Sequence, residues 1–259
     1  MSATVIAAQM HTVGRTIRSR ADVITALKRV RAMGYKAVQM GGGEPITAAE
    51  LKKVLDGEGL TLSSLQLMYK RVEQELPALI EECRLFGTRY IAIAVLPDRY
   101  WSREGYEKFL DETSAAAEKL GAEDLVLCYH NHEFEFKKFG DRTGMDILFS
   151  RPNPPCLCSE LDTYWVQYGG GDPVKWIRRL TGRIPLIHLK DMAIRAESLG
   201  DRAQLMTEVG DGNLDWPAIL PACKEAGVAW YIVERDSGER DPFESLEVSL
   251  KNLNEMGLE

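Results

Sequence analysis

Strand-like and helix-like segments alternate along the whole chain, and this alternation constrains the fold more than any other feature. Most of the apolar runs are followed by a stretch with helical spacing, and the expected strands are residues 5–11, 35–40, 60–68, 90–95, 125–130, 157–163, 185–190 and 230–234. The connections are too long for hairpins, which predicts parallel strands joined by crossover helices. Eight such units in 259 residues predict an α/β fold, namely a single-domain (β/α)8 TIM barrel over residues 1–259.

An open doubly wound sheet is the alternative arrangement of the same segments. It would usually carry a phosphate-binding glycine loop after an early strand, and the run Gly41-Gly42-Gly43 lacks that spacing. Helix starts support the alternation: Thr47 with Glu50 forms a capping box, and Asp241-Pro242 opens the last helix. No linker or shift in composition divides the chain, so the closed barrel is favoured.

Charge and composition argue against several classes of protein. The net charge is −7, whereas a nucleic-acid binder normally shows a basic balance. No apolar run approaches the roughly 20 residues of a membrane span, and the N-terminus lacks the basic region of a secretory signal. The odd number of cysteines, five, fits a reduced interior. We therefore expect a cytoplasmic protein whose partners include neither nucleic acid nor membrane.

Metal-ligand side chains stand where four of the expected strands end. The strands run into Tyr129-His130-Asn131-His132-Glu133-Phe134-Glu135-Phe136, Leu161-Asp162-Thr163-Tyr164-Trp165, Ile187-His188-Leu189-Lys190-Asp191 and Ile232-Val233-Glu234-Arg235-Asp236. In a TIM barrel the C-terminal ends of the strands carry the reactive residues. These segments therefore predict one site assembled at that end of the barrel.

Asp162, His188 and Glu234 are the strongest candidate metal ligands. Each follows an apolar run, at a point where an unpaired buried charge would be costly. The packing alternatives are an N-cap aspartate, a satisfied core histidine and a salt bridge between Glu234 and Arg235. A mixed set of oxygen and nitrogen ligands suits Mn²⁺, Zn²⁺, Co²⁺ or Fe²⁺ better than Mg²⁺. We expect one divalent metal ion, and Mn²⁺ is the preferred candidate.

Two histidines at the end of the fifth strand can point into the barrel, because side chains along a strand alternate between its two faces. His130 and His132 share parity, as do His188 and Lys190, so all four can point toward the axis. Glu135 has the opposite parity and reaches the axis only if the chain bends after His132. The contribution of this segment to the metal site therefore stays open at this point.

These segments resemble the xylose-isomerase-like sugar phosphate isomerase/epimerase superfamily, in particular its inosose-dehydratase-like and 3-keto-sugar-processing branch. The resemblance extends over the whole chain and implies a TIM barrel with one divalent metal held by a Glu-Asp-His-Glu set. Asp162, His188 and Glu234 match the second, third and fourth ligands. The first ligand is usually a glutamate, but His130 stands at that position here. Either His130 ligates the metal, or Glu135 folds back to do so.

The chemistry that such a site allows is removal of a proton from a carbon beside a carbonyl. A metal orients and polarises the carbonyl oxygen while a base takes the proton. We expect Glu234 or His132 to be the base and Lys190 to stabilise negative charge on oxygen. The favoured function is a divalent-metal-dependent sugar isomerase or epimerase that acts on a sugar or keto-sugar through an enediolate-type intermediate.

Several side chains near the strand ends are candidate substrate contacts. Tyr164 and Trp165 offer an apolar face to a sugar ring, although such aromatics are as often core residues. The full set of candidates is His130, Tyr164, Trp165, Gln9, His11 and Arg235. Basic residues are scarce around the expected site, which favours an unphosphorylated substrate.

Three other functions compete with the isomerase. A dehydratase or lyase would use the same site for β-elimination from a keto-sugar or keto-inositol. A non-catalytic sugar-binding barrel is favoured only by the absence of a glutamate at position 130. A phosphodiesterase of the endonuclease IV type would need a multi-metal cluster with more histidines than the four in this chain. A homo-oligomer is compatible with the sequence.

Overall fold

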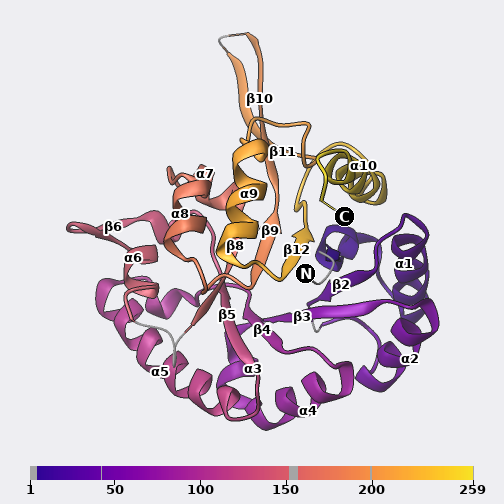
Figure 1. Ribbon diagram of the computed structural model, residues 1–259, viewed down its shortest axis with the longest axis horizontal. Coiled ribbons are helices and arrows are strands. Elements are labelled where there is room, and N and C mark those ends of the chain that lie inside the picture. Colours follow the sequence, from indigo (N-terminus) through magenta and orange to yellow (C-terminus); the bar gives the residue numbers. More distant parts are fainter. Residues whose placement is uncertain (1–4, 42, 152–156, 199, 259) are drawn as a thin grey trace.

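Eight parallel strands form a closed ring at the centre of the protein, as the computed structural model shows (Figure 1). The structure describes residues 5–41, 43–151, 157–198 and 200–258. Around the ring the strands follow the order β1-β12-β9-β8-β5-β4-β3-β2. They are β1 (Val5–Gln9), β2 (Ala37–Met40), β3 (Thr61–Leu67), β4 (Tyr90–Ile93), β5 (Val126–His130), β8 (Cys158–Asp162), β9 (Leu186–Leu189) and β12 (Trp230–Val233). The eight predicted runs coincide with these strands, so the predicted barrel is confirmed.

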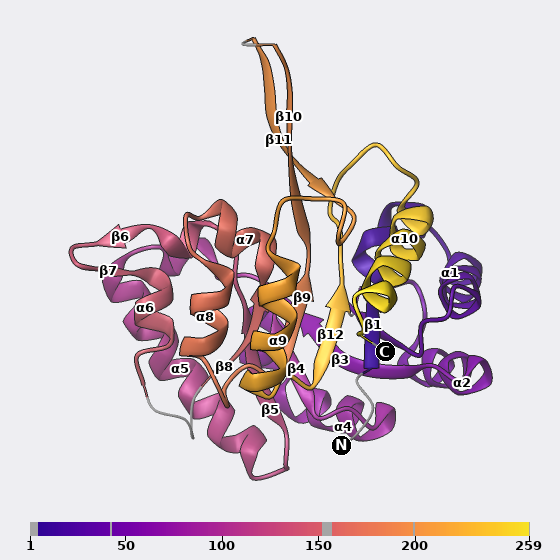
Figure 2. The ribbon, with the colours of Figure 1, turned by 45° about the horizontal axis from the view of Figure 1, so that its top comes forward.

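Helices surround the ring on its outer side (Figures 1 and 2). They are α1 (Arg20–Ala32), α2 (Ala48–Glu58), α3 (Tyr69–Gln74), α4 (Leu76–Phe86), α5 (Arg103–Gly121), α6 (Gly144–Leu148), α7 (Thr163–Tyr168), α8 (Pro173–Arg179), α9 (Trp216–Ala226) and α10 (Pro242–Glu255). Their apolar faces and the outward side chains of the strands share one large hydrophobic core. None of the described helices is long and apolar enough to cross a membrane.

Local sequence signals fix where the helices begin and end. The predicted capping box is present at α2, where Thr47 accepts the backbone N–H of Glu50 and the Glu50 carboxylate accepts that of Thr47. Asp241 caps α10 through the backbone N–H of Phe243. At the other end, α2 stops at Gly59, whose φ of 65° lies in the left-handed region that glycine adopts most readily.

The interior of the barrel is built in two layers. Small and aliphatic side chains fill the lower layer: Ala7, Ala37, Ala92, Cys128, Cys158, Leu186 and Ile232. Side chains two residues further along a strand point to the same side. The residues that follow at this spacing form a buried polar layer: Gln9, Gln39, His130, Glu160, His188 and Glu234. Strand parity thus places the polar residues together at the C-terminal mouth.

The first strand ends two residues earlier than predicted. The Gln9 side chain accepts the backbone N–H of His11, and the chain enters a 3-10 helix, Met10–Thr16. His11 therefore lies at the rim of the barrel rather than in the strand.

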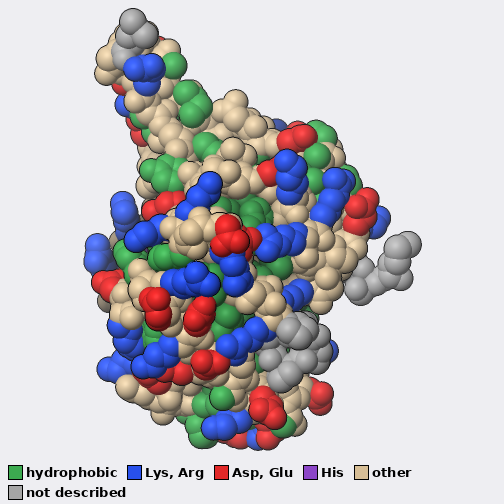
Figure 3. Space-filling model, turned by 90° about the vertical axis from the view of Figure 1, so that its left-hand side faces the viewer, with side chains coloured by type: hydrophobic (Ala, Val, Ile, Leu, Met, Phe, Trp, Pro, Cys, Tyr) green, Lys and Arg blue, Asp and Glu red, His purple; other side chains and the backbone are tan. Residues whose placement is uncertain are grey.

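A long antiparallel hairpin projects from the mouth (Figures 1 to 3) and was not predicted. It consists of β10 (Asp191–Ser198) and β11 (Asp201–Thr207). The buried Asp191 carboxylate holds its base, because it accepts hydrogen bonds from the Trp216 indole at 2.6 Å and from the backbone of Gly210 at 2.9 Å. A second, minor hairpin joins β6 (Lys138–Phe139) to β7 (Arg142–Thr143). On the face shown in Figure 3, acidic and basic side chains are interspersed.

Candidate active site

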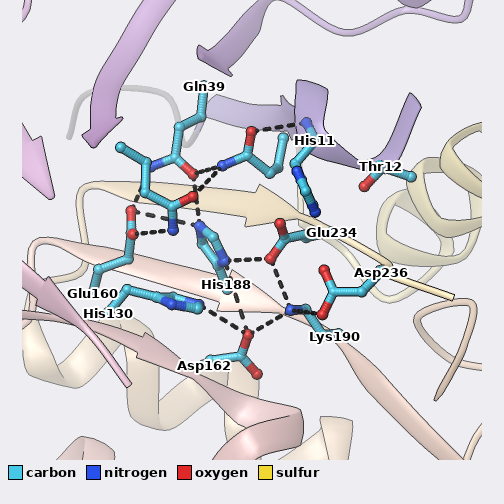
Figure 4. A network of polar contacts seen from close by, with 12 residues as sticks. His11, Thr12, Gln39, His130, Glu160, Asp162, His188, Lys190, Glu234 and Asp236 are labelled. Carbon is cyan, nitrogen blue, oxygen red and sulfur yellow. Dashed lines mark hydrogen bonds and ion pairs between the residues drawn. The ribbon is translucent and has the colours of Figure 1, made fainter. Parts of the chain in front are cut away.

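Four buried side chains converge at the mouth of the barrel (Figure 4). His130 ends β5, Asp162 ends β8, His188 lies in β9 and Glu234 follows β12. One ligand atom from each lies within 4.8 Å of the corresponding atoms of the other three. His188 Nδ1 is 2.8 Å from a Glu234 oxygen, and His130 Nε2 is 3.2 Å from an Asp162 oxygen. Three of these residues are those the strand ends singled out, and His130 completes the group.

The orientation of the two imidazoles suits a metal ion. The outer nitrogen of His130, Nδ1, lies 3.1 Å from the carbonyl oxygen of Ala94. The outer nitrogen of His188, Nε2, lies 2.7 Å from the side-chain oxygen of Gln39. Each outer nitrogen thus faces a hydrogen-bond acceptor. The inner nitrogens face the two carboxylates, and a metal-binding histidine likewise has one ring nitrogen toward the ion and the other toward an outer partner.

Glu135 is not brought into this group. A 3-10 helix, Phe134–Phe136, bends the chain, and the buried carboxylate binds the Tyr129 hydroxyl and the backbone N–H of His132, the latter at 2.9 Å. The expectation that Glu135 folds back onto the axis as a metal ligand is corrected accordingly. Burial raises the pKa of Glu135 to about 8, although its hydrogen bonds act in the opposite direction.

This buried carboxyl makes stability depend on pH. Since its folded-state pKa lies above the unfolded value, the folded protein holds the proton more tightly between pH 4.5 and about 8. The contribution to stability is complete below this window and is lost as the pH rises through it, a loss of about 5 kcal/mol at most. We expect Glu135→Gln to flatten this part of the pH profile of the unfolding free energy, measured by urea denaturation at pH 5 and pH 8.5. Parallel profiles for the two proteins would contradict the assignment.

Other side chains of the buried polar layer support the group of four. The fully buried Glu160 accepts hydrogen bonds from the side-chain amides of Gln39 and Gln66, and one of its oxygens lies 3.5 Å from His188 Nε2. Glu160 and Gln66 were missed by the sequence analysis. The signal was present for Glu160, which stands two residues before Asp162 and so has the same parity. Nothing in the sequence indicates that Gln39 and Gln66 bind it.

Lys190 joins three carboxylates. Its ammonium group lies 2.8 Å from Glu234, 3.0 Å from Asp162 and 3.0 Å from Asp236. Burial would raise the pKa of Asp162, but the Lys190 charge and the hydrogen bond from His130 outweigh it and hold the pKa at about 2. Burial likewise opposes ionisation of Glu234, yet Lys190 and His188 keep its pKa well below the ordinary value. Both carboxylates are therefore ionised at neutral pH.

His132 stands beside the group and has one ring nitrogen without a hydrogen bond among the described residues. Burial, reinforced by the neighbouring His130, lowers the pKa of His132 to about 3, so the ring is neutral. Its Nδ1 is buried and has no hydrogen-bond partner within the described residues. The Trp165 ring lies 5.4 Å from it and 5.6 Å from the Lys190 ammonium, both measured to ring centroids. A neutral imidazole with an unused nitrogen is ready to bind a substrate group.

A cavity of about 410 Å³, here called the reaction cavity, opens above these residues. His130, His132, Lys190 and Glu234 line it, and His11 lies on its rim. Its volume falls in the range of about 300–1,000 Å³ typical of small-molecule sites. His11, one of the predicted substrate contacts, therefore lies at this cavity.

The other predicted substrate contacts have different positions. Gln9 is fully buried beneath the cavity, where its amide group binds Gln39 and Gln66. Tyr164 and Arg235 line a separate cavity of about 620 Å³ at the base of the β10–β11 hairpin. The Arg235 guanidinium is 2.5 Å from Glu208 there. The structure therefore does not bring these three side chains to the reaction cavity.

Comparison with known proteins agrees with the fold. The chain is 26% identical to the rhizopine catabolism protein MocC of Rhizobium meliloti over 89% of its length and 80% of that protein. It is 25% identical to inosose dehydratase of Clostridium beijerinckii, over 89% and 88% of the two chains. A sugar phosphate isomerase/epimerase from Parabacteroides distasonis has the same fold, with a TM-score of 0.79, 21% identity and coverage of 98% and 96%. The sequence profile of the xylose isomerase-like TIM barrel family matches residues 27–256, and the chain belongs to this family.

Proposed function

We propose that the protein is a divalent-metal-dependent isomerase or epimerase that moves a proton on a carbon beside the carbonyl of a sugar or keto-sugar. The observation that carries this proposal is the convergence of His130, Asp162, His188 and Glu234 next to a buried lysine. His130, Glu234 and that lysine, Lys190, line the reaction cavity. Two imidazoles and two carboxylates around a common centre fit one divalent ion. Relatives with this fold include an inosose dehydratase and a sugar phosphate isomerase/epimerase, which supports chemistry on a sugar-like substrate.

His130, Asp162, His188 and Glu234 would hold the ion. Mn²⁺ is our first choice, with Zn²⁺, Co²⁺ and Fe²⁺ as alternatives, because imidazole and carboxylate ligands suit these ions. When bound, the ion supplies a Lewis acid that polarises and orients the carbonyl and hydroxyl oxygens of the substrate. Burial opposes the charged form of His188, but the Glu160 and Glu234 carboxylates outweigh it and raise the pKa of this ring to about 10. His188 would therefore give up a proton on binding an ion.

Glu234 is the base in this proposal. Its carboxylate is ionised, lines the reaction cavity and is fixed by His188 and Lys190, so it can accept a proton from the substrate carbon. The Lys190 ammonium lies in the same cavity and stabilises negative charge that develops on the substrate oxygen. The neutral His132 binds a substrate hydroxyl through its unused nitrogen and is the second group able to exchange a proton.

Dehydration is the second candidate, because inosose dehydratase is among the relatives with similarity along most of the chain. The same proton removal would then be followed by loss of a hydroxyl from the neighbouring carbon. The assay that separates the reactions is turnover of sugars, keto-sugars and keto-inositols in D₂O, analysed by mass spectrometry. An isomerase or epimerase yields a product of unchanged composition with deuterium incorporated, whereas a dehydratase yields a product that has lost water.

The dependence on metal is tested in the same assay. We expect the chelated protein to be inactive and to recover activity when the ion is restored. Full activity without metal would contradict the proposal. Sugar binding without turnover in either state would instead favour the non-catalytic barrel.

Glu160 is expected to position a metal ligand without touching the ion itself. The change Glu160→Gln removes the negative charge that faces His188 Nε2 and that accepts hydrogen bonds from Gln39 and Gln66. Loss of such an outer partner typically weakens metal affinity by about 10–100-fold. Isothermal titration of the metal-free protein with Mn²⁺ measures the change. The matched control is Glu112→Gln, whose carboxylate binds tyrosines away from the site. Equal affinities for the two variants would show that Glu160 has no positioning role.

A further inference from the structure

A second cavity, here called the outer cavity, shares a wall with the reaction cavity. Its volume is about 580 Å³, and it lies between the 3-10 helix Met10–Thr16 and the loop after β2. His11, Gly41 and Asp236 line both cavities. In Figure 4 the His11 ring points toward Glu234. A molecule bound over the reacting groups can therefore extend past His11 into the outer cavity.

The polar groups of the outer cavity are available to a ligand. The Arg15 guanidinium and the His11 ring have no hydrogen bond or ion pair with any residue that the structure describes. Within the part of the chain that the structure describes, the Glu44 carboxylate accepts one hydrogen bond, from the backbone N–H of Gly41 at 2.9 Å, so it can accept further ones. Arginine and carboxylate side chains hold several donors and acceptors in fixed directions, which matches vicinal hydroxyl groups.

The charge of the outer cavity excludes a strongly anionic group. Arg15 is opposed by Glu44, and the Asp236 carboxylate is already bound to Lys190 at 3.0 Å. A phosphate would need an excess of positive charge. Ile17 and Pro45 give the same cavity apolar walls. Balanced charge, hydrogen-bonding groups and apolar walls together suit a neutral sugar ring, which has hydroxyls at its edge and C–H groups on its faces.

We propose that the outer cavity is a second subsite that takes a neutral sugar unit attached to the sugar that reacts. The substrate is then a glycoside or disaccharide of the keto-sugar class, not a free or phosphorylated monosaccharide. This inference rests on the proposed function, because the reaction cavity must hold the reacting keto-sugar. The reacting unit lies over Glu234 and Lys190, and the attached unit passes His11 to reach Arg15 and Glu44.

Gly14 allows the subsite to be filled without disturbing the barrel. It lines the outer cavity, and a Cβ atom added there would meet no other atom within 4 Å. Gly14→Phe should therefore occupy the outer cavity and leave the reaction cavity open. Gly57→Phe is the matched control, because Gly57 has the same open surroundings but lies in α2 on the outside of the barrel. Arg15→Ala is a second variant that removes the guanidinium without adding bulk.

The experiment measures dissociation constants of the Mn²⁺-loaded protein by isothermal titration. The probes are D-fructose, the glycosyl-fructoses turanose, maltulose, lactulose and isomaltulose, and fructose 6-phosphate. We expect at least one disaccharide to bind about tenfold or more tightly than fructose, which corresponds to about 1.4 kcal/mol. Gly14→Phe should abolish this gain and Arg15→Ala should reduce it, while both retain the fructose affinity. Gly57→Phe should behave as the unaltered protein.

Three results would overturn the inference. The first is equal affinity for fructose and every disaccharide, and the second is a gain that survives in Gly14→Phe. The third is fructose 6-phosphate binding more tightly than any disaccharide, which would make the outer cavity an anion site. In each case fructose still binds, so the proposed function stands. Absence of binding by every probe, together with absence of turnover, would reject the proposed function and this inference with it.

Discussion

Replacing His188 by alanine is expected to lower the affinity for a divalent ion by more than about a hundredfold. Changes to the outer partners of a ligand already cost about 10–100-fold, and His188 supplies the inner nitrogen that faces Glu234 at 2.8 Å. Since the proposed reaction depends on the ion, turnover should be lost with it. Titration of the metal-free variant with Mn²⁺, with circular dichroism to verify the fold, measures the effect.

His11→Ala is the matched control for this change. His11 is a histidine at the same mouth of the barrel, but it stands on the rim and is exposed, outside the group of four. Its replacement should leave the affinity for Mn²⁺ unchanged. A His188→Ala protein that is folded and binds Mn²⁺ as tightly as the His11→Ala protein would remove His188 from the ligand set.

Replacing Lys190 by methionine is expected to destabilise the metal-free protein by about 3–5 kcal/mol, the usual cost of removing one partner from a buried ion pair. The side chain is 1% exposed, and its ammonium is shared by Asp162, Glu234 and Asp236. Without it, three negative groups face one another at the mouth. A divalent ion would replace the lost charge, so Mn²⁺ should raise the melting temperature of the variant more than that of the unaltered protein. Turnover should fall by about 10²–10³-fold, as for loss of other groups that stabilise a developing oxyanion.

Lys52→Met provides the comparison for Lys190→Met. Lys52 pairs with Asp56 on the surface of α2, and its side chain is 30% exposed. Pairs of this kind contribute less than about 1 kcal/mol. Equal stability of the Lys190→Met and Lys52→Met proteins without metal would show that the buried ammonium does not hold the carboxylates together.

The sequence was sufficient to predict the barrel, because most of its parallel strands are followed by a segment with helical spacing. It also predicted which strand ends meet, since parity sends the side chains of Asp162, His188 and Glu234 to one axis. That inference needs only the two-residue alternation of side chains along a strand and the closure of the sheet into a ring. The roles of these residues in metal binding and catalysis remain predictions until they are tested.

Features that depend on partners distant in sequence were not predictable. Glu135 was an equal candidate to His130 because parity fails once a chain leaves its strand, and the 3-10 helix Phe134–Phe136 then turns the carboxylate toward Tyr129. The side chains that support the site include neutral amides such as Gln66, and sequence patterns do not distinguish these from surface residues. The β10–β11 hairpin lacks a regular apolar alternation because neither of its faces is covered by the barrel (Figure 2).

The central claim is that one divalent ion is held by side chains from four separate strand ends. Anomalous diffraction from crystals grown with Mn²⁺ tests it most directly. The account predicts one strong peak per chain, within coordination distance of His130, Asp162, His188 and Glu234. The absence of a peak at this position, or a peak coordinated by Glu135 in place of His130, would contradict it.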